Sequence, residues 1–283
     1  MSGGEPSTGA PLPHATVGVE ARQLAMAAGV DPDDAATLQP AYDGVEVARL
    51  AREAGAPVLY AFRSVTSTQD VAHRLAASGT PAGTVVLADE QRTGRGRQGR
   101  RWLSNAGGGV WMTLVERPPD AAALAVLSLR LGLAAAGVLD RFAAEPVQLK
   151  WPNDLYLAAG KLGGILAEAR WRDDRPEWAV LGIGINVRRP SADVGAALPD
   201  GTPRRTLVAA LVPALRSAAG CRGPLTAAEL AAWEARDLAL GRRVSAPVAG
   251  IVEGIDADGG LRVRGDDGLV RLLRGGSLIF EDG

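Results

Sequence analysis

Runs of hydrophobic residues, separated by turn signals, divide the chain into a long mixed body and a short β-rich tail. In the body, apolar runs of strand length alternate with stretches of helical periodicity. The predicted strands cover about 58–62, 84–88, 110–115, 161–169 and 178–187. The predicted helices cover about 17–28, 44–54, 67–77, 121–143, 204–219 and 226–238. This mixture indicates an α+β fold.

The two ends of the chain differ from the body. Residues 1–16 are rich in Gly, Pro, Ser and Thr, which predicts an irregular start. The tail contains short β runs at 248–255, 261–263 and 269–273, separated by Asp/Gly turns, and so predicts a small antiparallel barrel. We therefore expect three parts: an N-terminal extension, a main body and a C-terminal domain, covering 1–56, 57–240 and 241–283.

The distribution of charge argues against nucleic acid and membranes as partners. The chain has 31 basic and 32 acidic residues, so it has no overall positive field. Residues 1–56 hold three arginines and eight acids, a net charge of −5, and no basic recognition helix. No apolar run approaches the roughly 18 residues that a membrane span needs. We expect a soluble cytoplasmic protein that does not bind DNA.

Two lysines stand out against this arginine-rich background. Of the 31 basic residues, only Lys150 and Lys161 are lysine. A biased composition that replaces lysine by arginine would spare the positions where a compact ammonium is required. Both lysines are therefore candidates for chemistry, and both fall in the motif-rich region 149–168.

A glycine- and arginine-rich segment follows the second predicted strand. Residues 94–99 (GRGRQG) fit the pattern of a dinucleotide-binding loop. That loop should open a helix, whereas the sequence after residue 99 has no helical pattern, so we reject the dinucleotide interpretation. Residues 92–101 hold five arginines and no acid. Guanidinium groups on glycine hinges suit a flexible loop that closes over a polyanion, although a solvated basic loop is the alternative.

Three further segments carry groups suited to a phosphate-rich ligand. Residues 149–155 (LKWPNDL) place an amine, an amide and a carboxylate on one turn, where the carboxylate could bind Mg²⁺ or an incoming nucleophile. Residues 160–166 (GKLGGIL) are not a phosphate-binding P-loop, because Leu162 follows the lysine. In strands, the glycines of this segment and of 182–186 (GIGIN) would let a ligand lie against the backbone.

Together these motifs resemble the biotin protein ligase family, in the order that the family has them. The resemblance covers about 57–190 and includes Ser67-Thr68-Gln69, Gln91 and Trp102; the tail matches the family's C-terminal barrel more loosely. Gln69 stands where the family more often has asparagine, and Gln98 where it often has arginine. The implied fold is a mixed sheet packed with helices, like that of class II aminoacyl-tRNA synthetases, followed by a small SH3-like β-barrel.

The resemblance also implies roles for individual residues. It implies biotin contacts by Ser67, Thr68, Gln69, Gln91, Arg95, Gly96, Arg97, Lys161, Gly164 and Gly182. It implies ATP contacts by Arg97, Arg100, Trp102, Lys150, Asn153 and Asn186, with Trp102 stacked on adenine. The catalytic residues would be Arg95, Arg97, Lys161 and Asp154. Asp154 would orient the acceptor amine, and it is also the candidate ligand for Mg²⁺.

The expected activity is ATP-dependent formation of biotinyl-5′-AMP and transfer of biotin to a lysine of a biotin carboxyl carrier protein, a subunit of an acyl-CoA carboxylase. The chain would act as a ligase without a DNA-binding domain, as a monomer or homodimer. Two alternatives remain: a lipoate ligase or related acyl transferase with the same fold, and a non-enzymatic biotin sensor or repressor. The arginine loop and the C-terminal barrel favour biotin, and the missing basic residues disfavour the repressor.

Overall fold

The structure is a computed structural model that describes residues 19–190 and 195–281. The predicted irregular start at 1–16 lies outside this part of the chain. Within it, no helix has the length and hydrophobicity that a membrane span requires.

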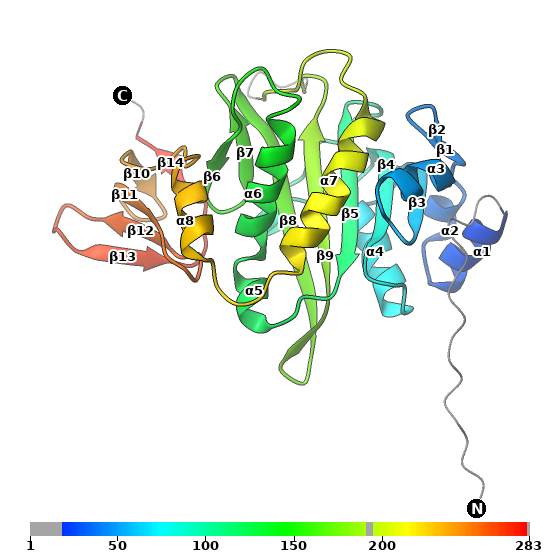
Figure 1. The fold of residues 1–283 in the computed structure, drawn as a ribbon, viewed down its shortest axis with the longest axis horizontal. Coiled ribbons are helices and arrows are strands. Elements are labelled where there is room, and N and C mark those ends of the chain that lie inside the picture. Colours follow the sequence, from blue (N-terminus) through cyan, green and yellow to red (C-terminus); the bar gives the residue numbers. More distant parts are fainter. Residues whose placement is uncertain (1–18, 191–194, 282–283) are drawn as a thin grey trace, which may run out of the picture.

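A seven-stranded sheet forms the centre of the molecule (Figure 1), with strand order β3-β4-β5-β9-β8-β7-β6. Its strands are β3 (Leu59–Val65), β4 (Thr84–Gln91), β5 (Gly109–Glu116), β6 (Gln148–Lys150), β7 (Asp154–Leu157), β8 (Gly160–Arg172) and β9 (Arg175–Asn186). Strands β3 and β4 are parallel, and the other neighbours are antiparallel. The predicted mixed sheet is confirmed.

Alternation along the strands gives the sheet two apolar faces. In β3, Leu59 and Ala61 pack into the core on one face, whereas Tyr60 and Phe62 pack into the core on the other. The first face is covered by α6 (Leu127–Leu139) and α7 (Arg204–Ala219), which lie side by side in Figure 1, and also by α3 (Val47–Glu53). The second face is covered by α1 (Val19–Ala27), α2 (Pro32–Ala35) and α4 (Thr68–Ala77). Both faces of the sheet are therefore buried around β3 and β4.

Several predicted element boundaries were wrong. The helix expected at 44–54 begins only at Val47, because Asp43 and Gly44 have positive φ angles and turn a hairpin between β1 (Ala41–Tyr42) and β2 (Val45–Glu46).

The helix expected at 121–143 is divided into α5 (Ala121–Ala125) and α6, which ends at Leu139. There Asp140 accepts a hydrogen bond from the Val147 N–H and pairs with Arg236, so its side chain ties the helix end to β6. The helix expected at 226–238 is α8 (Ala227–Glu234).

The tail folds into a five-stranded antiparallel sheet with strand order β13-β12-β11-β10-β14. The strands are β10 (Arg243–Ala246), β11 (Gly250–Ile255), β12 (Leu261–Arg264), β13 (Val270–Leu273) and β14 (Ile279–Phe280). This agrees with the predicted small SH3-like domain. It lies beyond the β6 edge of the central sheet, at the opposite end from α1 and α2 (Figure 1). The indole N–H of Trp151 donates to the Gly259 carbonyl at 3.0 Å and so links the two domains.

Candidate functional site

A cavity of about 430 Å³ opens where β8, β9, the loop after β4 and the turn between β6 and β7 meet. Most of the residues with predicted site roles line it. They are Thr68, Gln69, Gln91, Arg95, Gly96, Arg97, Arg100, Trp102, Lys150, Asn153, Asp154, Lys161, Gly164 and Gly182. Segments that are far apart in the sequence thus contribute to one site.

Two of the predicted site residues, Ser67 and Asn186, do not line the cavity but form hydrogen bonds within the segments around it. The Ser67 hydroxyl is buried and caps α4, accepting a hydrogen bond from the Gln69 N–H at 3.3 Å. The Asn186 amide donates to the carbonyls of Ala196, at 3.0 Å, and Lys161, at 3.3 Å. Their predicted contacts with biotin and ATP stay predictions.

One end of the cavity carries neutral hydrogen-bonding groups. The Gln91 carbonyl oxygen accepts from the backbone N–H of Thr68 at 2.9 Å and from its hydroxyl at 3.0 Å. The Gln91 amide donates to the Ser104 hydroxyl at 2.8 Å, and the Thr113 hydroxyl donates to that of Thr68 at 2.8 Å. This chain of contacts fixes the side-chain orientations, so the end is preorganised for an uncharged polar ligand group.

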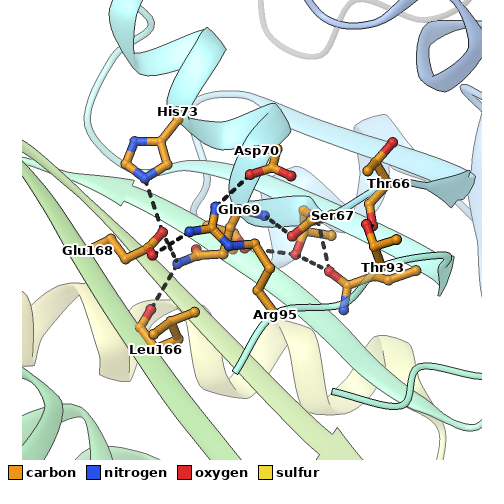
Figure 2. Close-up of polar contacts among 12 residues, drawn as sticks. Thr66, Ser67, Gln69, Asp70, His73, Thr93, Arg95, Leu166 and Glu168 are labelled. Carbon is orange, nitrogen blue, oxygen red and sulfur yellow. Dashed lines mark hydrogen bonds and ion pairs between the residues drawn. The ribbon is translucent and has the colours of Figure 1, made fainter. Parts of the chain in front are cut away.

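The arginine-rich loop is fastened to two elements through Arg95 (Figure 2). Its guanidinium donates to Asp70 on α4 at 2.6 Å and to Glu168 on β8 at 2.7 Å. The other oxygen of Glu168 accepts from the Gln69 amide at 3.3 Å and lies 3.2 Å from the His73 ring nitrogen. The hydrogen bond with His73, followed by the charge of Arg95, lowers the pKa of Glu168 below its ordinary value. The carboxylate is thus held in the charged form that binds Arg95.

Glycines form the part of the cavity wall on which Trp102 lies. A Cβ at Gly184 would lie 2.6 Å from the Trp102 indole nitrogen, and a Cβ at Gly164 would lie 3.3 Å from its ring. Side chains at these positions would displace the indole. The ammonium of Lys161 lies 5.2 Å from the centre of the Trp102 ring and 2.6 Å from a carboxylate oxygen of Asp154. An aromatic face, an ammonium and a carboxylate therefore converge at this point.

The other end of the cavity, around Asp154, carries the cations Lys150, Lys161 and Arg97. The lining of the whole cavity also includes Arg95, Arg100 and Arg101, against one carboxylate among the described lining residues, that of Asp154. Arg97 donates to the Asn153 side chain at 3.2 Å, which joins the loop to the β6–β7 turn. Burial lowers the pKa of the Arg97 guanidinium, although Asp154 opposes the shift. This excess of cations suits a polyanionic ligand.

Lys150 also belongs to this end, and the C-terminal domain covers it. Its ammonium lies 4.8 Å from the ring centre of Phe280 and 5.6 Å from that of Tyr156. Burial lowers the pKa of Lys150, and the charge of Lys161 acts in the same direction, whereas Asp154 opposes it. A bound anion would favour the charged ammonium of Lys150 and so oppose the effect of burial on its pKa.

Sequence reasoning missed several lining residues. Tyr156 lies two positions after Asp154 in β7, so strand alternation would have placed both on one face. Ser277, Leu278 and Ile279 of the C-terminal domain also line the cavity, and no motif marks them. Their position depends on the contact between the two domains.

Known proteins share both the sequence pattern and this fold. Residues 61–186 match the biotin/lipoate A/B protein ligase family. The chain is 35% identical to a biotin–(acetyl-CoA-carboxylase) ligase of Paracoccus denitrificans over 217 residues, which are 68% of this chain and 88% of that one. It is 33% identical to the ligase of the same name from Mycobacterium tuberculosis, over 76% of this chain and 82% of that one. The chain belongs to the biotin protein ligase family.

Comparison with two further family members shows how much of each chain the similarity covers. The biotin protein ligase of Aquifex aeolicus, solved in complex with biotin and ATP, superposes with a TM-score of 0.64 and 26% identity over 80% of this chain and 99% of that one. The bifunctional ligase/repressor BirA of Bacillus spizizenii is 40% identical over 143 residues. That match spans 48% of this chain but only 42% of the length of BirA.

Proposed function

We propose that this member of the family is an ATP-dependent biotin protein ligase, which forms biotinyl-5′-AMP and transfers biotin to a lysine of a biotin carboxyl carrier protein. The observation that carries the proposal is the difference in polarity between the two ends of this one cavity. Its Thr68–Gln91 end is neutral and hydrogen-bonding, whereas the end at Arg97, Lys150 and Lys161 is cationic. Biotin has a neutral cyclic urea and a carboxylate, and ATP is a polyanion. The cavity suits biotin at one end and the phosphates at the other.

In the first half-reaction, an oxygen of the biotin carboxylate attacks the α-phosphorus of ATP. The new bond is the mixed anhydride of biotinyl-5′-AMP, the bond between the α- and β-phosphates breaks, and pyrophosphate leaves. Both reactants are anions, so the site must neutralise charge and align them rather than supply a nucleophile. Lys161 and Arg97 lie where they can do so, and Trp102 offers a flat surface for adenine.

In the second half-reaction, the acceptor lysine loses a proton to solvent and its nitrogen attacks the biotinyl carbonyl. The amide bond forms, and AMP leaves with the electron pair of the broken anhydride bond. Asp154 is our candidate for orienting this amine, because its carboxylate lines the cavity and already binds one ammonium, that of Lys161. The ion pair with Lys161 shows that the Asp154 carboxylate can bind an amine at hydrogen-bonding distance.

Mg²⁺ fits this site only as a companion of ATP. The described residues contain no cluster of three or more His, Cys, Asp or Glu side chains that could hold a metal. Mg²⁺ is commonly bound by one or two carboxylates together with substrate phosphates, and Asp154 could supply one. Bound in this way, the ion would neutralise phosphate charge.

The test is release of pyrophosphate that depends on both biotin and ATP, followed by labelling of a biotin carboxyl carrier domain. We expect biotin to be activated and lipoate to be ignored. Activation of lipoate alone would favour the lipoate ligase alternative, and biotin binding without pyrophosphate release would favour the sensor alternative. An electrophoretic mobility-shift assay checks the predicted lack of DNA binding, and sedimentation checks whether the chain is a monomer or a homodimer.

A further inference from the structure

We infer that Asp34, in the acidic N-terminal extension, is a positioning residue that holds the base of the arginine-rich loop through Arg92. The inference rests on the proposed function, because it assigns the extension a part in binding biotin. Asp34 lies on α2, before the residues that match the family, and none of the predicted site residues lies in this segment. The inference thus gives the acidic turn at residues 31–34 a structural role in the site.

The contacts of Asp34 converge on one carboxylate oxygen. This Oδ1 accepts from the Thr66 N–H at 2.9 Å, from the Thr66 hydroxyl at 3.3 Å and from the Arg92 guanidinium at 2.7 Å. The Asp34 side chain is 4% exposed, whereas that of Arg92 is 43% exposed. A buried carboxylate needs such partners, and hydrogen bonds to a charged group are the stronger kind.

The two partners of Asp34, Thr66 and Arg92, each directly follow a strand of the central sheet. Because β3 and β4 are parallel, their carboxyl ends lie at the same edge. Thr66 follows β3 and directly precedes Ser67 and Thr68, at the neutral end of the cavity. Arg92 follows β4 directly after Gln91. Asp34 thus joins the two segments that build the predicted biotin end of the cavity.

Arg92 is also where the two ends of the loop meet. Its backbone N–H donates to the Val65 carbonyl at 2.8 Å, and its carbonyl accepts from the Arg101 guanidinium at 2.9 Å. Next to it, the Thr93 N–H donates to the Thr66 carbonyl at 2.9 Å. Fixing Arg92 therefore fixes the hinge from which residues 94–101 extend over the cavity.

The described part of the extension, from residue 19 onward, packs into the core and can act as a brace. Ala21, Ala25 and Ala35 of α1 and α2 belong to the same buried core as Val71 and Leu75 of α4.

The segment that follows α2 adds backbone pairing to this packing. The Gln39 N–H donates to the Ala61 carbonyl at 2.9 Å, and the Arg63 N–H donates to the Thr37 carbonyl at 2.8 Å. Asp34 is thus anchored on both sides, and its contact with Arg92 transmits that rigidity to the loop.

The experiment compares Asp34→Asn with Asp33→Asn in the full chain. Asparagine keeps the size of the side chain and an oxygen for the Thr66 N–H, but it removes the charge that binds Arg92. Asp33 is the matched control, because it lies on the same helix and is exposed. Arg92→Gln removes the same contact from the loop side and leaves the extension intact.

Three measurements follow each variant: the KM for biotin against kcat, the rate of tryptic cleavage at Arg95–Arg101 without ligand, and the thermal midpoint. We expect Asp34→Asn to raise the KM for biotin about tenfold with a smaller change in kcat, in line with the loss of a hydrogen bond to a charged group. Tryptic cleavage of the loop should be faster in Asp34→Asn and in Arg92→Gln than in the wild type. In Asp33→Asn, the KM values and the cleavage rate should equal those of the wild type.

In a double-mutant cycle, Asp34→Asn should add little once Arg92 is replaced, because the two residues act through one contact. Additive effects, or equal loop cleavage in Asp34→Asn and Asp33→Asn, would overturn the inference. The cleavage measurement needs no activity. A wild-type protein that releases no pyrophosphate would therefore reject the proposed ligase function, while the cleavage rates would still decide whether Asp34 braces the loop.

Discussion

The ammonium of Lys161 lies 2.6 Å from the carboxylate of Asp154 and 5.2 Å from the ring centre of Trp102. Lys161 is on β8 and Asp154 on β7, which are paired strands, so the contact is part of the sheet geometry. The two groups were predicted to serve opposite halves of the reaction. A substrate group that binds either side chain must therefore compete with this ion pair.

We expect Asp154→Asn to slow the second half-reaction far more than the first. The neutral side chain cannot orient the acceptor amine as an anion does, and misplacing a reacting group costs about 10²-fold. Single-turnover transfer from preformed adenylate should fall by about that factor, while pyrophosphate release changes less. Glu177→Gln is the control, because Glu177 lies near the start of β9, pairs with Arg172 and does not line the cavity. Full transfer in Asp154→Ala would reject the role.

The ion pairs of Arg95 with Asp70 and Glu168 should hold the loop at residues 92–101 against α4 and β8. The Arg95 side chain is 41% exposed, so each ion pair alone contributes about 1 kcal/mol or less. We expect the double variant Asp70→Asn/Glu168→Gln to raise the KM for biotin about fivefold and to speed tryptic cleavage within 92–101. Biotin plus ATP should protect the wild-type loop. Identical cleavage of wild type and double variant would show that these pairs do not hold it.

The contact of Trp102 with Gly184 predicts a steric effect on nucleotide binding. Gly184→Ala places a methyl group 2.6 Å from the indole nitrogen, and such overpacking costs about 1–3 kcal/mol. We expect the KM for ATP to rise about tenfold, with a smaller change for biotin.

The control is Gly137→Ala, on the exposed side of α6, where nothing lies within 4 Å. It should leave both KM values unchanged and stabilise the protein by about 0.5–1 kcal/mol in chemical denaturation, because alanine loses less conformational entropy than glycine in a helix. An unchanged KM for ATP in Gly184→Ala would mean that the indole does not contact the nucleotide.

Lys150 predicts a pH dependence of ATP binding on the alkaline side. Burial lowers its pKa from the ordinary 10.5, so in the free enzyme the ammonium loses its proton at a lower pH than an exposed lysine does. The cation that would bind phosphate is present below that pKa and lost above it. We expect the KM for ATP to rise as the pH increases toward 10. Lys150→Arg, which stays charged, should flatten this rise; a profile unchanged by Lys150→Arg would assign the rise to another group.

The chemistry of the site was predictable because it depends on side-chain types in short segments. The arginines of residues 92–101 and the two lysines indicated a polyanion site, the family resemblance added Trp102, and most of the predicted residues line one cavity. The alternation of strand and helix patterns likewise predicted the α+β class, and the family resemblance implied the mixed sheet. Turn residues set several boundaries that periodicity alone missed, such as Asp43-Gly44.

By itself, the sequence determined the α+β class, the order of the motifs and the family, because each of these depends on local patterns. Only the tertiary structure decided which partners those residues have. Lys161 pairs with Asp154, Arg95 with Asp70 and Glu168, and Asp34 reaches Arg92 from a segment 58 positions earlier in the chain. The physical reason is that sheet pairing and the burial of apolar faces bring distant segments together. Charge contacts between those segments depend on that packing and leave no periodic trace in the sequence.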